Sequence, residues 1–201
     1  MPELTIICVS YQRYQHIYVL LHCFLAQTLQ NFRLIVLHDG PDPQMESILT
    51  SFKNAHPEKI DFYFSEERYN DYGHSLREKG IELAQSEYLL ITNDDNYYCP
   101  KFLELMFEAI HLQKADIALC DMIHSHDTPG GRDQGPYRYF ETAPMRYSID
   151  MGCFITKTAL AKKSGFRDKT HDGDATFFED ILEIAENPVI AKLNQALFYH
   201  N

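Results

Sequence analysis

Short apolar runs alternate with segments of helical periodicity along the first half of the chain. Four runs are short, rich in β-branched residues or leucine, and closed by polar residues, as buried strands are; they cover residues 4–9, 33–37, 60–64 and 88–92. The segments between them repeat apolar side chains at helical spacing and predict helices over 14–27, 43–52 and 74–84. Strands that alternate with helices form βαβ units, so we expect a largely parallel sheet covered by helices on both faces.

The second half starts with the same alternation and then loses it. Pro100 suits the first turn of a helix, and a strand is expected over 116–120. Residues 122–147 are rich in glycine and proline, which predicts a long functional loop or lid, the alternative being a mobile hairpin without a role. Regular structure resumes with strands expected over 148–155 and 196–201, a short helix from Lys157 and a helix over 174–186.

The composition is that of a globular protein. The 201 residues are 45% hydrophobic and 23% charged, a balance that excludes wholesale disorder. No run approaches the roughly 18 apolar residues that cross a bilayer, and the first residues lack the basic start of a signal peptide. Because no linker or internal repeat interrupts the chain, we expect a single domain over 1–201.

Charge and cysteine content narrow the partners and the compartment. Eighteen Lys and Arg against 29 Asp and Glu give a net charge of −11, which argues against a nucleic-acid partner or an anionic membrane patch. The five cysteines are scattered without Cys-x-x-Cys spacing, which argues against a disulfide framework or a zinc knuckle. We therefore expect a cytoplasmic protein with reduced thiols.

Polar residues follow three of the predicted strands, at the points where those strands end. The clusters are Ser10-Tyr11, His38-Asp39-Gly40 and Asn93-Asp94-Asp95-Asn96. Because ligands of open parallel sheets bind beyond the carboxyl ends of the strands, we expect these clusters to converge on one site. The alternative for each cluster alone is an ordinary turn, since Asp, Asn and Gly are the usual turn residues.

The adjacent carboxylates of Asp94 and Asp95 are the sharpest chemical feature. Two neighbouring carboxylates repel each other unless positive charge lies beside them. A divalent cation held by one or two carboxylates and by substrate phosphates is an arrangement that suits Mg²⁺ or Mn²⁺. The alternative is a solvated acidic turn that leads into the helix after Pro100.

The ordered combination of several motifs resembles glycosyltransferase family 2. The matching segments are Thr5 to Arg13, Gln27 to Phe32, Leu34 to Gly40, Arg77 to Ala84, the Asp94-Asp95 pair, and the acidic region Asp172 to Asp180. Within the family, the spacing is especially similar to bacterial spore-coat polysaccharide glycosyltransferases. Each piece is weak alone, but the resemblance covers nearly the whole chain.

The resemblance implies an A-type fold, that is, a Rossmann-like, mainly parallel sheet flanked by helices. A nucleotide-sugar half would cover about 1–98 and an acceptor half about 99–201. The sequence departs from the family pattern at His38, Pro41, Glu78 and Asn93, where the family commonly has aspartate, serine, asparagine and aspartate. These departures affect base and ribose recognition more than the overall activity.

The resemblance also implies roles for individual residues. Tyr11 would pack on the nucleobase and Asp39 would accept a base N–H; the nucleotide-binding set is Ser10, Tyr11, Arg13, Asp39, Arg77 and Asp94. The metal ligands would be Asp95, Asp94 and His200, binding Mn²⁺ or Mg²⁺. The alternatives are a core-edge aromatic for Tyr11, a solvated helix cation for Arg77 and an incidental residue for His200. His124 and His126, in the expected lid, are interpreted as polar surface, with metal binding as the alternative.

The implied reaction is a single in-line displacement with inversion at the anomeric carbon. The acceptor hydroxyl then needs a carboxylate as general base. Asp174 is the first choice for that base, with Asp180 and Glu179 as competitors, and an N-cap of the last helix is its alternative role.

The resemblance implies a nucleotide-sugar donor, most simply a UDP-sugar, and a glycan or lipid-linked acceptor. A homodimer and peripheral attachment to a membrane are compatible with this interpretation. Two other functions remain open: a sugar nucleotidyltransferase, and a nucleotide-sugar binding module without turnover. The first normally has a glycine-rich loop after the first strand, whereas residues 10–13 contain no glycine.

Overall fold

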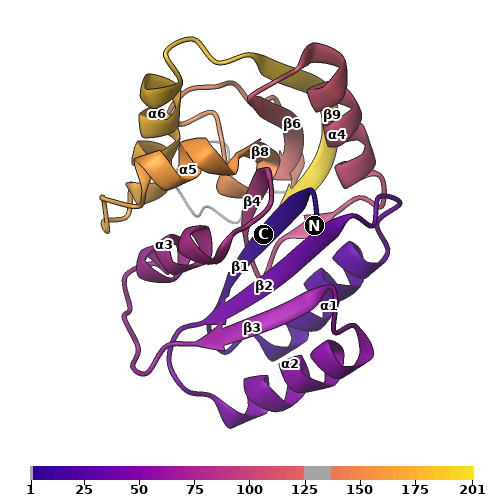
Figure 1. Ribbon diagram of the computed structural model, residues 1–201, viewed down its shortest axis with the longest axis vertical. Coiled ribbons are helices and arrows are strands. Elements are labelled where there is room, and N and C mark those ends of the chain that lie inside the picture. The colour runs from indigo at the N-terminus through magenta and orange to yellow at the C-terminus, as the bar shows by residue number, and fades with distance from the viewer. Residues whose placement is uncertain (1, 125–136) are drawn as a thin grey trace.

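Helices surround one curved sheet in the computed structural model, which describes residues 2–124 and 137–201 (Figure 1). The strands are β1 (Leu4–Ser10), β2 (Phe32–His38), β3 (Ile60–Phe64), β4 (Tyr88–Asn93), β5 (Tyr97–Tyr98), β6 (Ile117–His124), β7 (Arg138–Phe140), β8 (Phe154–Lys157) and β9 (Ile190–His200). The helices are α1 (Tyr14–Leu25), α2 (Pro43–Ala55), α3 (His74–Leu83), α4 (Phe102–Gln113), α5 (Thr158–Ser164) and α6 (Gly173–Ala185), and Met151–Cys153 forms the 3-10 turn η1.

The sheet is parallel in its first half and mixed in its second. The strand order is β3-β2-β1-β4-β8-β6-β9-β5, with β7 paired to β6. Strands β1 to β4 pair in parallel, as predicted. Beyond β4 the sheet is mixed: β6 and β9 pair in parallel, whereas β8 runs antiparallel to β4 and β6, and β5 runs antiparallel to β9. Strands β7 and β8 both run antiparallel to β6. Antiparallel neighbours can be joined without a crossover helix, whereas parallel neighbours need a long crossover connection.

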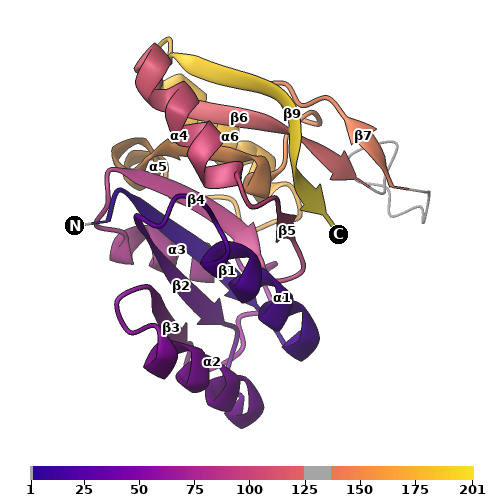
Figure 2. The same cartoon turned by 90° about the vertical axis from the view of Figure 1, so that its right-hand side faces the viewer.

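The order of the parallel strands decides which face each helix covers. The chain steps from β1 outward to β2 and β3, and then returns past β1 to β4. Because such crossovers are right-handed, α1 and α2 cover one face and α3 covers the other (Figure 2). Helix α3 contacts β1, β2 and α5, and α5 packs on α6. The face that carries α3 is thus continuous with the helices of the second half.

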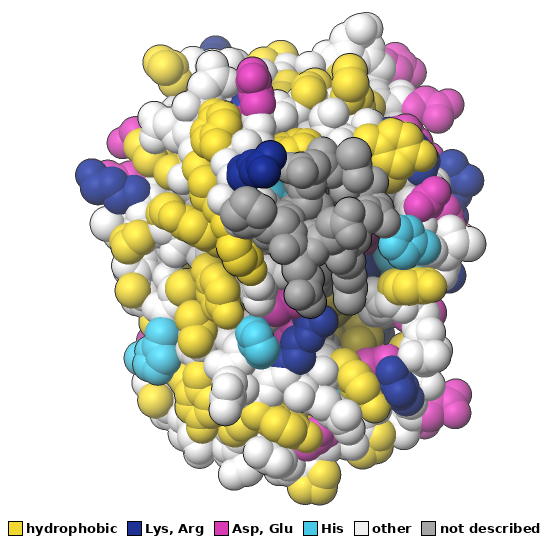
Figure 3. All heavy atoms as spheres, turned by 180° about the vertical axis from the view of Figure 1, so that it is seen from behind, with side chains coloured by type: hydrophobic (Ala, Val, Ile, Leu, Met, Phe, Trp, Pro, Cys, Tyr) yellow, Lys and Arg dark blue, Asp and Glu magenta, His cyan; other side chains and the backbone are white. Residues whose placement is uncertain are grey.

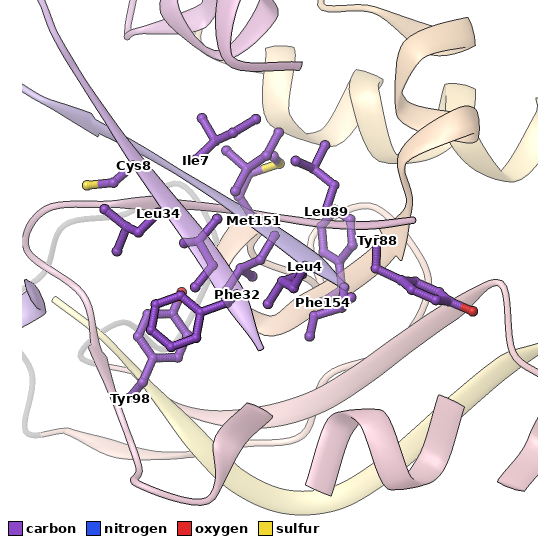
Figure 4. Close-up of a cluster of buried hydrophobic side chains, with 14 of the residues drawn as sticks. Leu4, Ile7, Cys8, Phe32, Leu34, Tyr88, Leu89, Tyr98, Met151 and Phe154 are labelled. Atoms are coloured by element: carbon purple, nitrogen blue, oxygen red, sulfur yellow. The ribbon is translucent and has the colours of Figure 1, made fainter. Parts of the chain in front are cut away.

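The core lies where the parallel strands meet the second half of the chain. Strand β1 is buried at all seven positions because helices cover both of its faces. Figure 4 shows the cluster around it, which includes Leu4, Phe32 and Tyr98. The Tyr98 ring centroid lies 4.7 Å from those of both Phe24 and Phe102, which ties β5 to α1 and α4.

Three predictions for the second half need correction or completion. The strand expected over 148–155 begins only at Phe154, because the Asp150 carboxylate accepts the Gly152 N–H at 2.8 Å and caps η1 instead. Strand β9 is longer than predicted because its polar first half pairs with β6 across a register shift. Of the predicted loop 122–147, residues 122–124 belong to β6 and residues 138–140 form β7, whereas residues 125–136 lie outside the described residues.

The helices are short relative to a bilayer. The longest of those described, α2 and α6, have 13 residues each. Within 2–124 and 137–201, no helix has the length and apolar character to cross a membrane.

Candidate functional site

A cleft of about 570 Å³ opens where the carboxyl ends of β1 and β4 face the second half of the chain. Its walls also include the ends of β6 and β9 and the start of α6. Eight of the residues predicted for the site line it: Ser10, Tyr11, Arg13, Asp39, Arg77, Asp94, Asp174 and His200. Asp95 and Asp180 are not among the lining residues. The three polar clusters that follow the strands thus meet, as their positions at the strand ends require.

Asp94 is a buried carboxylate at the floor of this cleft. Its side chain is 2% exposed, its Oδ2 accepts from Ser10 Oγ at 2.6 Å, and its Oδ1 accepts from Arg13 Nη1 at 3.1 Å. Burial raises the pKa of Asp94 to about 6, although Ser10 and Arg13 act in the opposite direction. The same guanidinium nitrogen also donates to Asp95. Arg13 therefore neutralises the adjacent carboxylates.

One end of the cleft combines an aromatic ring, a cation and a carboxylate. The guanidinium carbon of Arg68 lies 3.9 Å from the ring centroid of Tyr11, and Arg68 Nε lies 3.9 Å from Asp39 Oδ2. The Asp39 carboxylate accepts the backbone N–H groups of Tyr69 at 2.7 Å and Asn70 at 3.1 Å. A flat ring beside a fixed carboxylate suits a nucleobase, which has an aromatic face and polar edges.

Arg77 is a buried guanidinium that connects the two halves of the chain. It donates to the Tyr72 carbonyl at 3.0 Å and to Asn93 Oδ1 at 2.8 Å, and its Nη1 lies 3.2 Å from Asp174 Oδ1. Its fourth neighbour is His74 Nδ1 at 2.8 Å. Arg77 is only 3% exposed, so the alternative of a solvated helix cation is wrong.

The two candidate bases have different surroundings. Asp174 faces the cleft with its side chain 40% exposed, whereas both Asp180 oxygens accept from Arg167, at 2.7 and 2.8 Å. The alternative N-cap role of Asp174 is wrong, because α6 begins at Gly173 with Asp172 as its N-cap residue. Glu179 is held by Arg146 at 2.6 Å. Of the three candidate bases Asp174, Asp180 and Glu179, only Asp174 lines the cleft.

Histidines lie at the ends of β6 and β9, across the cleft from Asp94. The rings of His124 and His200 stack with centroids 4.5 Å apart, and His200 Nε2 lies 3.3 Å from Asp150 Oδ2. His124, which we interpreted as polar surface, is 7% exposed and lines the cleft, so that interpretation is wrong. His126 lies outside the described residues.

The side chains near Asp94 suit a hard divalent cation in chemistry but do not form a complete ligand cage. Carboxylates at Asp94 and Asp95 and the imidazole of His200 are the donor types that Mn²⁺ and Mg²⁺ accept. In the described part of the chain, no group of three or more His, Cys, Asp or Glu side chains is close enough to hold an ion. An ion at this position would thus need further ligands, such as phosphate oxygens.

Arg68, His74 and Asp150 line the cleft although the sequence analysis did not select them. Arg68 follows the end of β3, so a systematic inspection of every strand end would have found it. His74 precedes Arg77 by one helical turn, a spacing that places the two side chains on the same face. Asp150 lies within the segment 148–155 that was predicted as a strand, and nothing in the sequence near it indicates a site.

The charge on the surface is mixed. On the face drawn in Figure 3, Lys and Arg side chains are scattered among acidic and hydrophobic ones and do not gather in one basic patch. A nucleic-acid footprint needs clustered positive charge, and the side chains coloured on this face form no such cluster.

Comparison with known families gives one match over most of the chain. A family model described as glycosyl transferase family 2 matches residues 5–169. The match includes β1, β2, β4 and the acidic pair that follows β4.

Solved structures share the fold at low sequence identity. Residues 1–349 of S. aureus TarS match with a TM-score of 0.79 and 20% identity over 99% of this chain and 60% of that chain. The same fragment in complex with UDP-GlcNAc has a TM-score of 0.77 and 19% identity, with coverages of 98% and 58%. A mannosyltransferase from Pyrobaculum calidifontis, PcManGT, in complex with GDP-Man and Mn²⁺, has a TM-score of 0.72 and 13% identity, with coverages of 99% and 56%. The predicted A-type fold is confirmed, and the chain spans about 60% of the length of the TarS fragment.

Proposed function

The chain belongs to glycosyl transferase family 2, and on that premise we propose that it transfers a sugar from a nucleotide-sugar donor to an acceptor hydroxyl with inversion. One observation carries the proposal: groups suited to a nucleotide and a half-exposed carboxylate, Asp174, line the same cleft from different halves of the chain. In this proposal residues 1–98 bind the donor, residues 99–201 supply most of the acceptor side, and both belong to one domain.

The donor we propose is a UDP-sugar. Its base would lie against Tyr11, with a base N–H directed to Asp39, and its ribose and diphosphate would extend toward Ser10, Arg13 and Asp94. TarS, a structural neighbour, has been solved with UDP and with UDP-GlcNAc. The mannosyltransferase carries GDP-Man, so a guanine nucleotide is the second candidate.

The chemistry follows from the position of Asp174. Its carboxylate would accept the proton of the acceptor hydroxyl while the acceptor oxygen bonds to the anomeric carbon and the bond from that carbon to the diphosphate oxygen breaks. The electron pair of the broken bond leaves with the nucleoside diphosphate. Arg77, with its Nη1 3.2 Å from Asp174 Oδ1, would hold this carboxylate in a fixed orientation.

Asp94, Asp95 and His200 would hold a Mn²⁺ or Mg²⁺ ion together with the donor diphosphate. Such an ion, when bound, offsets negative charge that develops on the departing diphosphate. Arg13, which in this structure bridges Asp94 and Asp95, would then be free to contact the phosphates.

The acceptor we propose is a hydroxyl of a glycan or of a lipid-linked sugar. The nucleotidyltransferase alternative is disfavoured because residues 10–13, which line the cleft between β1 and α1, form no glycine-rich phosphate loop. A binding module without turnover has no need for a carboxylate at Asp174 beside the donor groups, which disfavours the second alternative.

A thermal-shift series tests the proposal. We expect UDP-glucose, UDP-GlcNAc or GDP-mannose with Mn²⁺ to raise the unfolding temperature, and the bound donor to be hydrolysed or transferred. Mn²⁺ with inorganic diphosphate is the control, because it offers the charge without the base or sugar. If no nucleotide sugar shifts the unfolding temperature beyond that control, the donor site is not where we propose it.

A further inference from the structure

Three exposed rings on the wall of the cleft near Asp174 have no part in the donor site. They belong to Tyr72, Tyr147 and His171 and are called here the aromatic rim. Tyr72 is 64% exposed and Tyr147 is 60% exposed, yet all three residues line the cleft. The rings of Tyr72 and His171 meet edge to face with centroids 5.8 Å apart. Large rings left in water beside a reaction site offer surface for a ligand to cover.

Polar contacts connect the rim to the start of α6. His171 Nδ1 lies 3.2 Å from Asp172 Oδ1, and Asp172 Oδ2 lies 3.7 Å from Arg146 Nη1. Arg146 precedes Tyr147 and also donates to Glu179 at 2.6 Å. These contacts hold the loop that carries Tyr147 against the helix that carries Asp174.

The two tyrosines of the rim are held in an uncommon backbone conformation. Tyr72 has φ of 60° and Tyr147 has φ of 66°, in the left-handed region that bulky side chains rarely adopt. The Tyr72 carbonyl is fixed by Arg77 at 3.0 Å, and the loop of Tyr147 is closed by the bond from Ser148 N to Met145 O at 3.1 Å. The backbone that carries each ring is thus fixed before a ligand binds, which lowers the entropy cost of ordering the rim.

The charges beside the rim select against an anionic ligand. Asp172 and Asp174 are 56% and 40% exposed. Of the cations beside them, Arg146 is already paired with Glu179 and Asp172, and Arg77 is 3% exposed and already paired with Asp174. A phosphate or carboxylate would meet this excess of negative charge. A neutral pyranose would not, and the C–H groups on one of its faces suit the electron-rich face of a tyrosine ring.

We propose that the aromatic rim binds a neutral pyranose ring of the acceptor and directs one of its hydroxyls to Asp174. This inference rests on the proposed function and names the acceptor class for the same cleft. The alternative occupant, an anionic polyol phosphate, is an outcome of the test.

Saturation-transfer NMR with the whole chain, UDP and Mg²⁺ tests this inference. The probes are methyl β-D-glucopyranoside, methyl β-D-galactopyranoside and glycerol 1-phosphate. We expect transfer to the glycosides, strongest at the hydrogens on one ring face, and none to glycerol 1-phosphate. Tyr72→Asn and Tyr147→Asn remove a ring and retain a residue that tolerates positive φ. Each should weaken glycoside binding about 2- to 10-fold, as expected for one aromatic contact.

Two controls make the result decisive. Tyr18→Asn removes an exposed tyrosine of α1 that does not line the cleft, and it should leave glycoside binding unchanged. Tyr72→Phe and Tyr147→Phe keep the rings and should keep glycoside binding. The UDP dissociation constant of every sample separates the two proposals, because samples that do not bind UDP contradict the donor site itself. Samples that bind UDP but show equal glycoside signals with and without the rings, or that prefer glycerol 1-phosphate, overturn the inference.

Discussion

His74 Nδ1 accepts a hydrogen bond from Arg77 Nη1 at 2.8 Å. A guanidinium only donates, so the proton of this imidazole is on Nε2, which faces the Thr170 carbonyl at 2.8 Å. His74 thus joins α3 to the segment that precedes α6, and it fixes the guanidinium that lies beside Asp174. Its ring also stacks on Phe166 with centroids 5.3 Å apart.

The first prediction concerns stability against pH. Burial, followed by the charge of Arg77, lowers the pKa of His74 below its usual 6.5, although Asp174 and Asp71 act in the opposite direction. Below about pH 6.5 the imidazole of His74 therefore binds a proton in the unfolded chain that it resists in the folded protein, and the contribution of His74 to stability falls as the pH falls. His74→Gln does not titrate, so its urea midpoints between pH 5 and 7 should change less steeply than those of the wild type. His22→Gln, at an exposed position on α1, should keep the wild-type slope, and a His74→Gln slope equal to it would contradict the prediction.

The second prediction separates the candidate bases. Asp174→Asn keeps the shape but cannot accept the acceptor proton near neutral pH, so the transfer rate should fall about 100- to 10,000-fold. Asp180→Asn, whose carboxylate pairs with Arg167 away from the cleft, should have a much smaller effect. Donor affinity, measured by calorimetry, should change little in both. A nearly normal transfer rate for Asp174→Asn would rule out its role as the base.

The third prediction concerns metal removal. UDP should bind more tightly with Mn²⁺ than in EDTA, and Asp95→Asn should remove most of that difference because it removes a proposed ligand. Asp61→Asn is the control, since Asp61 also pairs with cations, Arg33 and Lys53, but lies within β3 and not at the carboxyl end of β4. If the wild type binds UDP equally tightly with Mn²⁺ and with EDTA, the proposed metal site is contradicted.

The fourth prediction concerns the nucleobase. Tyr11→Ala should weaken UDP binding about 10-fold, because stacking of a base on an aromatic ring contributes roughly 1–3 kcal/mol. Tyr11→Phe keeps the ring and should bind UDP within about twofold of the wild type. Tyr14→Ala is the control, since this neighbouring tyrosine bonds to Asp42 and does not line the cleft. The prediction fails if Tyr11→Ala and Tyr11→Phe bind UDP equally well.

The fifth prediction concerns the packing of α3 on β1. A Cβ added at Gly80 would lie 2.6 Å from Ile7 Cγ2 in the buried core. Overpacking costs about 1–3 kcal/mol, whereas alanine gains roughly 1 kcal/mol over glycine in a helix, so we expect the cost to outweigh the gain. Gly80→Ala should therefore lower the urea midpoint, whereas Glu82→Ala, on the exposed side of α3, should leave it nearly unchanged. A higher midpoint for Gly80→Ala would show that Ile7 moves aside without cost.

The amino-acid sequence determined the elements of the first half and the position of its polar clusters. Residues 4–9 are apolar except for Thr5, and a strand of this kind must be covered on both faces, which places it inside a parallel sheet. Once β1 and β4 are parallel neighbours, Ser10 and Asp94 must end at the same edge. The Ser10–Asp94 hydrogen bond at 2.6 Å follows from that register.

Only the tertiary structure decided that β8 runs antiparallel to its neighbours and that Arg68 lies over the Tyr11 ring. It also decided which groups Arg77 contacts. Arg77 and Asp174 are 174 − 77 = 97 residues apart in the sequence, and they meet because α3 packs on α5 and α5 packs on α6. The periodicity of a segment reports which of its faces is buried, but it does not specify the element that covers that face. The choice among Asp174, Asp180 and Glu179 was likewise open in the sequence. In the structure Arg146 holds Glu179 and Arg167 holds Asp180, whereas Asp174 lines the cleft.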